Sequence, residues 1–320
     1  MYLLARTSGL TEEVWAGDKP RLVVDEQAEQ AWRRLNPTER YGNLLEAWFL
    51  RGRPEIVGEP GSRLFRIPQN FSDSLSFFAR IPDQGLQVAG DPDVEGLLRF
   101  RPGGYNLGLL DLFGLIEVQR AAPEPGLGWR IERIARTRLG EAVFVLLQAG
   151  LFGDLEKIGA LEGEKEIPSG VFQPMLRPIL PEWRNNLVVS RWAFRDGVHV
   201  FTVSLGRAWR RIAVPADASL DTLASAILDA FAFDSDHLYE FVYRDRFGAA
   251  EHAHHPYMDE GPWTSEVAVG DVPLQVGQGM TFVYDFGDWW QFAVKLERVD
   301  AGTRIRQPKV IAKQGRAPKQ

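Results

Sequence analysis

The chain has 320 residues and contains no cysteine, no long apolar run and no excess of positive charge. Without cysteine it has no disulfide, no thiolate nucleophile and no thiolate metal site, which fits a reducing compartment and favours a cytoplasmic location. No stretch has the ~18 consecutive apolar residues that a membrane span needs. The first ten residues also lack the basic and apolar regions of a signal peptide. We therefore expect neither secretion nor a membrane partner.

The charge balance is acidic, with a formal net charge of -6 and a pI of about 5.5. No whole-chain positive field exists to recruit nucleic acid, so any DNA contact needs a local basic patch. Glycine-rich phosphate loops and the Gly-x-Ser-x-Gly turn are missing as well, and we expect no cofactor. Hydrophobic residues make up 45% of the chain, enough for a core in each of two domains.

The first half of the chain, residues 1–150, predicts a mainly helical domain. Asn36 followed by Pro37 is typical of a helix start. The apolar residues after it recur on one helical face: Leu44, Leu45, Trp48 and Phe49. Further short helices are expected at 71–81 and 94–100, because proline and glycine separate these segments.

Residues 105–148 carry the clearest local pattern in this domain. It predicts a helix at 105–113, a strand at 115–120, a loop at 121–128, a strand at 129–135 and a helix at 137–147. This order is that of a winged-helix module, in which the first helix reads DNA bases and the loop is the wing. The sequence therefore predicts a winged-helix-like N-terminal domain.

A DNA-binding function for this module would need basic residues around the wing. Residues 97–140 hold seven arginines against four acids, and these arginines could neutralise phosphates. The candidate nucleic-acid contacts are Tyr105, Asn106, Arg120, Arg130, Arg133 and Arg136. The base-reading helix itself has no lysine or arginine, so a protein-interaction or structural module remains the alternative.

After a linker at 151–190, the pattern returns to a mixed α+β domain at 191–300. Strands are expected at 199–205 and 210–214, and Ser219 is placed to cap a helix that is followed by a strand at 238–243. Hairpin, helix and strand form a β-grasp-like opening. Further strands are expected around Val267 and at 280–286 and 290–299, and the basic tail at 301–320 is expected to be partly disordered.

Two segments in this domain alternate aromatic and acidic residues. They are Asp234-Ser235-Asp236-His237-Leu238-Tyr239-Glu240-Phe241 and Tyr284-Asp285-Phe286-Gly287-Asp288-Trp289-Trp290. Alternation lets a strand bury aromatic rings on one face and hold carboxylates and an imidazole on the other. With the strand Trp209-Arg210-Arg211-Ile212 and the closing segment 311–318, these two segments resemble the plasmid pRiA4b ORF-3-like family.

This resemblance covers roughly residues 191–300 and carries expectations of its own. The family includes proteins described as transposon passengers or TnpR-like, so the resemblance implies a compact α+β domain found in mobile elements and fused to varied partners. It implies no catalytic residues. The pair Trp289-Trp290 departs from the family pattern, in which an acidic or histidine residue follows a single tryptophan. The arrangement of a serine recombinase is not reproduced here.

The two segments also offer candidate catalytic groups. If their strands pair, several side chains could converge to bind a cation or run acid-base chemistry: Asp234, Asp236, His237, Glu240, Asp285 and Asp288. The alternative is that these acids cap turns or accept hydrogen bonds, with Arg210 or Arg211 as donors.

A separate histidine group offers metal ligands. A His-x-His pattern places two imidazoles on one face of a strand, so His252, His254 and His255 are the metal candidates. A polar loop between two strands explains these residues equally well.

The sequence thus favours a non-enzymatic binding or regulatory protein, with a protein or DNA as the partner. Tyr239, Tyr284 and Trp290 are expected to form the partner surface of the C-terminal sheet, and the wing arginines to supply phosphate contacts. The alternatives are a metal-assisted hydrolase or nuclease that uses the Asp/His group, and a structural scaffold.

Overall fold

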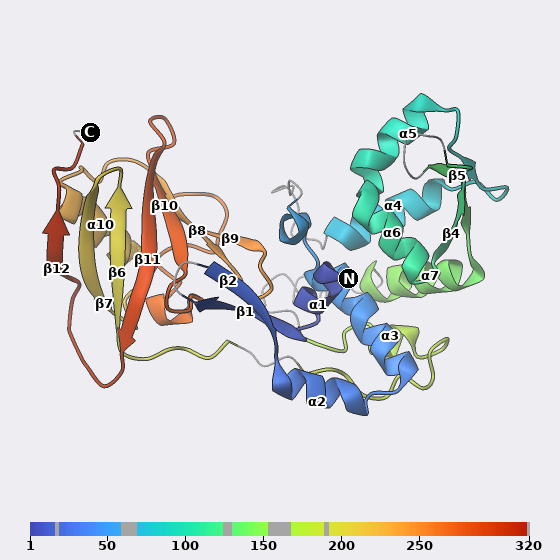
Figure 1. Cartoon of the computed structure of the whole chain (residues 1–320), viewed down its shortest axis with the longest axis horizontal. Coiled ribbons are helices and arrows are strands. Elements are labelled where there is room, and N and C mark those ends of the chain that lie inside the picture. Colours follow the sequence, from blue (N-terminus) through green and yellow to red (C-terminus); the bar gives the residue numbers. More distant parts are fainter. Residues whose placement is uncertain (17–18, 59–68, 124–129, 153–167, 189–191, 319–320) are drawn as a thin grey trace. The chain divides into compact units, whose positions relative to one another are not determined.

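The computed structural model describes residues 1–16, 19–58, 69–123, 130–152, 168–188 and 192–318 (Figure 1). The contacts within the chain divide it into two compact units. The N-terminal unit comprises Met1–Leu10 and Val24–Val189, and the C-terminal unit comprises Thr11–Val23 and Ser190–Gln320. The structure is therefore mixed α+β, with helices dominating the first unit and an antiparallel sheet the second.

The N-terminal unit begins with helices that local sequence signals define. They are α1 Tyr2–Thr7, α2 Glu26–Arg34, α3 Pro37–Glu46 with the π turn η1 Ala47–Arg51, and the short η2 Pro54–Val57. Asn36 and Glu39 form a capping box: each side chain accepts a hydrogen bond of 2.8 Å from the other residue's backbone N–H. The helix expected after Asn36 is confirmed, and Trp48 and Phe49 on its apolar face are fully buried.

The described part of the expected linker, residues 168–188, packs into the N-terminal unit. It contains the short helix α9 Gln173–Leu176, and its Phe172 and Trp183 are buried. The buried carboxylate of Glu46 accepts hydrogen bonds from the backbone N–H groups of Gly170 (2.6 Å) and Phe172 (2.7 Å). This segment is thus part of the folded unit and differs from an extended linker, because it supplies apolar side chains to the core.

The second part of the N-terminal unit has the expected order of helix, strand, strand and helix. Its elements are α4 Gln69–Arg80, β3 Leu86–Gln87, α5 Pro92–Leu98, the π turn η3 Arg99–Gly103, α6 Gly104–Leu112, β4 Ile116–Arg120, β5 Ile131–Arg136 and α7 Arg138–Phe152. The strands form a small antiparallel sheet in the order β3-β5-β4. The short strand β3 was not predicted, and residues 124–129 of the expected wing lie outside the described residues.

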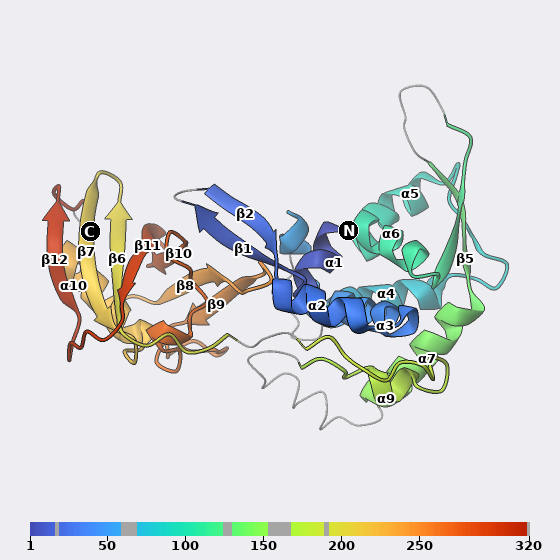
Figure 2. The same cartoon turned by 60° about the horizontal axis from the view of Figure 1, so that its bottom comes forward.

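The C-terminal unit is built on a seven-stranded antiparallel sheet. Its strands are β6 Val198–Leu205, β7 Ala208–Pro215, β8 Tyr239–Arg244, β9 Ala250–His254, β10 Gly279–Tyr284, β11 Trp290–Asp300 and β12 Lys309–Gln314. Their order across the sheet is β12-β7-β6-β11-β10-β8-β9, which Figure 2 shows from edge to edge. A separate two-stranded hairpin, β1 Thr11–Ala16 and β2 Lys19–Val24, precedes α2 in the chain.

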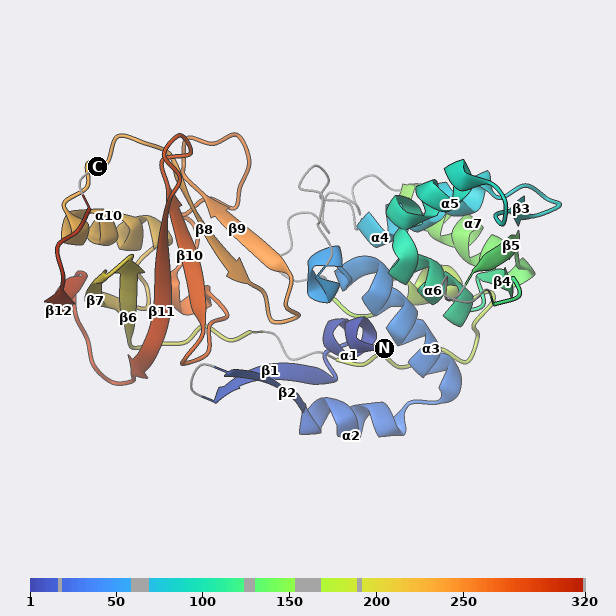
Figure 3. The same ribbon diagram turned by 45° about the horizontal axis from the view of Figure 1, so that its top comes forward.

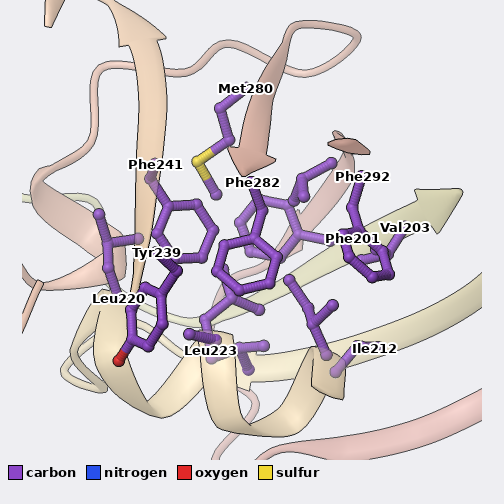
Figure 4. Packing of buried hydrophobic residues seen from close by; sticks show 14 of the residues in the cluster. Phe201, Val203, Ile212, Leu220, Leu223, Tyr239, Phe241, Met280, Phe282 and Phe292 are labelled. Atoms are coloured by element: carbon purple, nitrogen blue, oxygen red, sulfur yellow. The ribbon is translucent and has the colours of Figure 1, made fainter. Parts of the chain in front are cut away.

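One face of this sheet is covered by the helix α10 Leu220–Phe231 (Figure 3). Ser219 caps the helix as expected, because its hydroxyl accepts a hydrogen bond of 3.1 Å from the Thr222 backbone N–H. Leu220 and Leu223 of α10 pack against Phe241 and Phe282 of the sheet, as Figure 4 shows. The core of this unit therefore lies between α10 and one sheet face.

The structure adds detail to three expectations for the C-terminal unit, and the strand expected around Val267 was wrong. Val267 lies in no strand, and its neighbour Ala268 forms an isolated bridge with Ser219. The histidine segment, for which the sequence left a strand and a polar loop open, forms β9, a strand of the sheet. In the tail expected to be partly disordered, residues 309–314 form β12, which pairs with β7.

Within the described residues no helix combines the length and apolar character that crossing a membrane requires.

Candidate functional site

The two aromatic and acidic segments meet at one end of the large sheet. Tyr239 of β8 and Tyr284 of β10 are cross-strand neighbours, and the backbone N–H of Asp285 donates a hydrogen bond of 2.9 Å to the Leu238 carbonyl. We call the paired loops Asp234–Leu238 and Asp285–Trp289 the signature corner. The structure thus brings together the two segments that carry the family resemblance.

The Asp285–Trp289 loop is a tight turn with an unusual backbone. Asp285 has φ of 56° and Trp289 has φ of 57°, a left-handed conformation that costs energy for a residue as bulky as tryptophan. The turn is closed by a 2.6 Å hydrogen bond from the Trp289 N–H to the Asp285 carbonyl. The Asp285 side chain accepts a further bond of 2.9 Å from the Gly287 N–H. These bonds hold Trp289 at the end of the turn, directly before β11, and its side chain is about half exposed to solvent.

The exposed surface of the signature corner is apolar and acidic. Leu238 is 39% exposed and Trp289 is 48% exposed, and the carboxylates of Asp234, Asp236 and Asp288 are exposed beside them. The two stretches that build the corner, residues 229–243 and 276–294, contain no lysine and no arginine. The local charge is therefore negative around two large apolar side chains.

The six candidate catalytic side chains do not share one site. His237 lies between two carboxylates, with its Nε2 3.4 Å from Asp236 Oδ1 and 3.7 Å from Asp285 Oδ2. Glu240 is buried and instead faces His252, whose Nδ1 is 2.9 Å from Glu240 Oε2. The expectation that all six converge does not hold for Glu240, because it faces His252 whereas Asp236 and Asp285 face His237.

The histidine group is built around the buried Glu240 carboxylate. His254 Nδ1 lies 3.5 Å from Glu240 Oε2, and the rings of His252 and His254 stack with centroids 5.8 Å apart. His255 packs edge-on against Tyr239, and burial lowers the pKa of its imidazole. Among the described residues, no group of three His, Cys, Asp or Glu side chains is arranged to hold a metal ion.

Two members of the expected partner surface are core residues. Tyr284 is fully buried and its hydroxyl donates a hydrogen bond of 2.6 Å to the Asp234 carbonyl. Tyr239 is also buried and donates to the Asp221 carboxylate, and burial together with this carboxylate raises the pKa of its hydroxyl. Neither ring can contact a partner, because the strand alternation directs both toward α10. Trp290 is partly buried against the same core.

The expected base-reading residues of α6 are committed to the core of the N-terminal unit. Asn106 is buried, and its amide accepts a 2.9 Å hydrogen bond from the Trp48 indole and donates one of 2.9 Å to the Pro102 carbonyl. The Tyr105 hydroxyl donates to Asn70 at 2.6 Å. The expectation that Asn106 reads bases is wrong, because its polar atoms are already used inside the protein.

The wing arginines lie among acids that the window 97–140 left out. Arg130 is 3.2 Å from Glu95, and Arg136 pairs with Asp83. Residues 83–140 hold seven arginines and eight acids, so the local excess of positive charge disappears. Arg133 is partly buried near Gly85, and Arg120 is exposed at the end of β4.

The strand Trp209-Arg210-Arg211-Ile212 has structural roles that the sequence did not show. Buried Arg210 lies 4.6 Å from the Phe231 ring centroid and donates to the carbonyls of Ala230 (2.8 Å) and Gln314 (3.0 Å). Arg211, on the opposite face, forms a two-pronged pair with Glu297 at 2.6 and 2.8 Å. Both arginines thus bond to groups other than the acids of the signature corner, which were the expected acceptors.

Comparison with known proteins supports the resemblance over the C-terminal part. Residues 201–320 match the family model described as plasmid pRiA4b ORF-3-like protein. The C-terminal part of this chain is similar to plasmid pRiA4b ORF-3-like proteins. Its strand Trp209-Arg210-Arg211-Ile212 and both segments of the signature corner lie inside the matched region.

Two relatives of this pRiA4b ORF-3-like region are described without an activity. The uncharacterized protein y4hQ of Sinorhizobium fredii is 29% identical over 112 residues, which cover 34% of this chain and 56% of that protein. The chain therefore spans about half the length of this relative. A protein of unknown function, MM3350 from Methanosarcina mazei Go1, has a crystal structure that matches 40% of this chain and 75% of its own, with 25% identity and a TM-score of 0.34. The family-model match thus gives a resemblance over residues 201–320 and no reaction.

Proposed function

We propose that this protein is a non-enzymatic binding protein whose signature corner captures a basic segment of a partner protein. The N-terminal unit, with its winged-helix-like order of elements, is proposed as a second interaction module. The C-terminal unit, with its β-grasp-like opening, is proposed to work in the mobile-element setting that the family resemblance implies.

The observation that carries this proposal is the chemistry of the exposed corner. An arginine of a partner can stack on the face of Trp289, because a cation is attracted to the ring of an exposed tryptophan. Asp236 and Asp288 offer carboxylates for charge-assisted hydrogen bonds, and no lysine or arginine from the two stretches that form the corner competes for them. Leu238 adds an apolar contact. A segment that alternates basic and aliphatic residues fits all three features.

The division of the acids speaks against the alternative of a metal-assisted hydrolase or nuclease. Two-metal hydrolysis needs carboxylates that surround ions about 4 Å apart. Asp236 and Asp285 flank His237, whereas Glu240 is buried against His252. Glu240 therefore lies apart from the carboxylates that face His237 and does not join them in one set of ligands.

The proposed role of the N-terminal unit is contact with protein, because its base-reading helix offers little to DNA. The residues of α6 that face solvent are Gly104, Gly108 and Leu112, the last of them 60% exposed. None can donate a side-chain hydrogen bond to a base edge. An apolar and sterically open helix face suits the packing of another protein.

Fluorescence anisotropy with the full-length protein tests the corner. The probe is a fluorescein-labelled nonapeptide of alternating Arg and Leu, and the comparison peptide carries Glu in place of Arg. The variant Trp289→Asn/Asp288→Asn keeps a residue that tolerates the left-handed conformation at position 289 and removes the ring and one charge. We expect this variant to weaken binding of the basic peptide by about tenfold or more.

The matched control changes an exposed aromatic and an exposed acid elsewhere in the same unit. Tyr257→Ala/Asp259→Asn removes such a pair from the loop after β9 and should leave binding unchanged. Spermidine and arginine amide serve as competitors, and neither should displace the peptide at equal concentration. Equal binding by the wild type and the corner variant would refute the proposed site, as would equal binding of the Glu peptide.

A further inference from the structure

The strand β12, Lys309–Gln314, lies at one edge of the seven-stranded sheet (Figure 1). We propose that its outer edge accepts an extended acidic segment of another protein, which adds to the sheet as a further strand. This surface is distinct from the signature corner, which is proposed to bind basic segments. The binding of a partner at β12 can therefore be tested separately from the function proposed above.

The two edge strands of the sheet, β9 and β12, differ in the backbone hydrogen bonds on their outer sides. At β9 the backbone of His254 is bonded on its outer side to the following loop: its N–H donates to Pro262 (2.9 Å), and its carbonyl accepts from Thr264 (2.7 Å). At β12 the only strand partner among the described residues is β7. An edge strand of this kind presents unpaired backbone donors and acceptors and serves as a template for an added strand.

The strand β12 is held in place before any partner arrives. Arg210 donates hydrogen bonds to the carbonyls of Gln314 (3.0 Å) and Gly315 (3.3 Å). The Trp209 indole donates to the Gln314 side chain at 3.0 Å. Because the edge is already ordered, only the incoming segment would lose conformational entropy when it binds.

The side chains of β12 define the chemistry of the partner. Val310 is 40% exposed and Ile311 is 43% exposed, and both are flanked by the exposed ammonium groups of Lys309 and Lys313. Residues 301–320 contain six lysines and arginines and no acid, whereas the other 300 residues hold 31 cations and 43 acids. Because Lys309 lies opposite Ala213 and Lys313 opposite Arg210, the two lysines face opposite sides of the sheet. An added strand of carboxylate and aliphatic residues would therefore meet a lysine with its carboxylates and cover apolar side chains with its aliphatic residues.

The same lysines argue against a second copy of this chain as the occupant. Two β12 strands that pair edge to edge would bring lysines of like charge together, which is destabilising. Edge lysines and a bulge, here the register shift between Val310 and Ala312, are devices that prevent unselective strand pairing. An acidic strand is the partner that these lysines admit.

The experiment uses the full-length protein and a fluorescein-labelled heptapeptide, Glu-Val-Glu-Ile-Glu-Val-Glu. Two further peptides are N-methylated, one at the odd residues and one at the even residues, so that each keeps its charge and side chains but loses the main-chain donors of one edge. We expect the unmodified peptide to bind and at least one of the two N-methylated peptides to lose binding. We also expect Lys309→Glu/Lys313→Glu to weaken binding by about tenfold or more.

The matched control has the same change in net charge. Arg99→Glu/Arg138→Glu reverses two exposed charges in the N-terminal unit and should leave peptide affinity within about twofold of the wild type. Hydrogen exchange of the β12 amides should slow when the unmodified peptide is added. Binding that survives N-methylation in both registers would reduce the interaction to charge attraction and overturn strand addition. Equal displacement of the peptide by short duplex DNA would overturn the choice of a protein partner.

Discussion

His199 is a buried residue whose protonation should govern stability in mild acid. It lies on β6 beside Phe201, with ring centroids 6.2 Å apart, and its Nδ1 has no hydrogen-bond partner within the described part of the chain. Burial, with a smaller effect of the Arg195 charge, lowers the pKa of the imidazole from 6.5 to about 4. The folded protein therefore holds this side chain neutral at a pH where the unfolded chain would protonate it.

The sign of the pH dependence follows from this lowered pKa. The stability is fully present above pH 6.5 and is lost as the pH falls toward 4, because only the unfolded state gains the proton. The loss attributable to His199 should approach about 3 kcal/mol in the free energy of unfolding. Urea denaturation at pH 7 and pH 5 should show a smaller decrease for His199→Leu than for the wild type. Equal decreases for His199→Leu and the wild type would contradict the prediction.

At the scale of elements, local signals predicted helices better than they predicted edge strands. The capping box at Asn36 and the cap at Ser219 lie within a few residues of the helices they start, so the sequence reveals them directly. By contrast, β12 becomes a strand only by pairing with β7, about a hundred residues earlier in the chain. The polar spacing of 309–314 carries no sign of that partner, so the sequence alone predicts a partly disordered tail.

The attachment of residues 168–188 to α3 is an element-scale feature that can be tested at Glu46. This fully buried carboxylate accepts from two backbone N–H groups, at Gly170 and Phe172. Burial raises the pKa of the carboxyl, while the two hydrogen bonds and the charge of Arg51 oppose that rise. Glu46→Ala removes the acceptor of the buried Phe172 N–H and of the partly buried Gly170 N–H, and it should cost about 3 kcal/mol of stability in the N-terminal unit.

Limited proteolysis of the folded protein measures this effect through cleavage within residues 168–188. Glu46→Ala should speed cleavage there strongly, since the segment loses its attachment to α3. The control is Glu29→Ala on α2, which removes an exposed ion pair with Arg33 and should cost less than about 0.5 kcal/mol. Cleavage of both variants at the wild-type rate would show that the segment is held by its apolar contacts alone.

At the scale of the whole molecule, charge is distributed unevenly and points to partners of opposite sign. The signature corner offers carboxylates around Trp289, while β12 offers lysines around Ile311. The sequence located the corner because its aromatic and acidic residues alternate, but it selected Tyr239 and Tyr284 as the exposed rings. Which of two neighbouring residues faces solvent depends on which sheet face α10 covers, and that choice lies outside the pattern of alternation.

The distribution of charge also predicts how weakly the wing surface should bind DNA. A protein that neutralises six to ten phosphates loses about a thousandfold or more in affinity between 50 and 200 mM salt. We expect no such dependence from the wing surface, because Arg130 and Arg136 pair with Glu95 and Asp83. Anisotropy of a labelled random duplex should give the same weak signal for the wild type and for Arg130→Ala/Arg133→Ala.

In the same assay, the variant Lys309→Glu/Lys313→Glu distinguishes DNA binding by the wing surface from DNA binding by the basic tail. Any residual low-salt binding that comes from the tail should fall in this variant and remain in Arg130→Ala/Arg133→Ala, since residues 301–320 hold cations without acids. A steep salt dependence that disappears with the two wing arginines would instead show that their ion pairs open for phosphates. In that case the N-terminal unit would be a DNA-binding module, and its proposed role in protein contact would have to be abandoned.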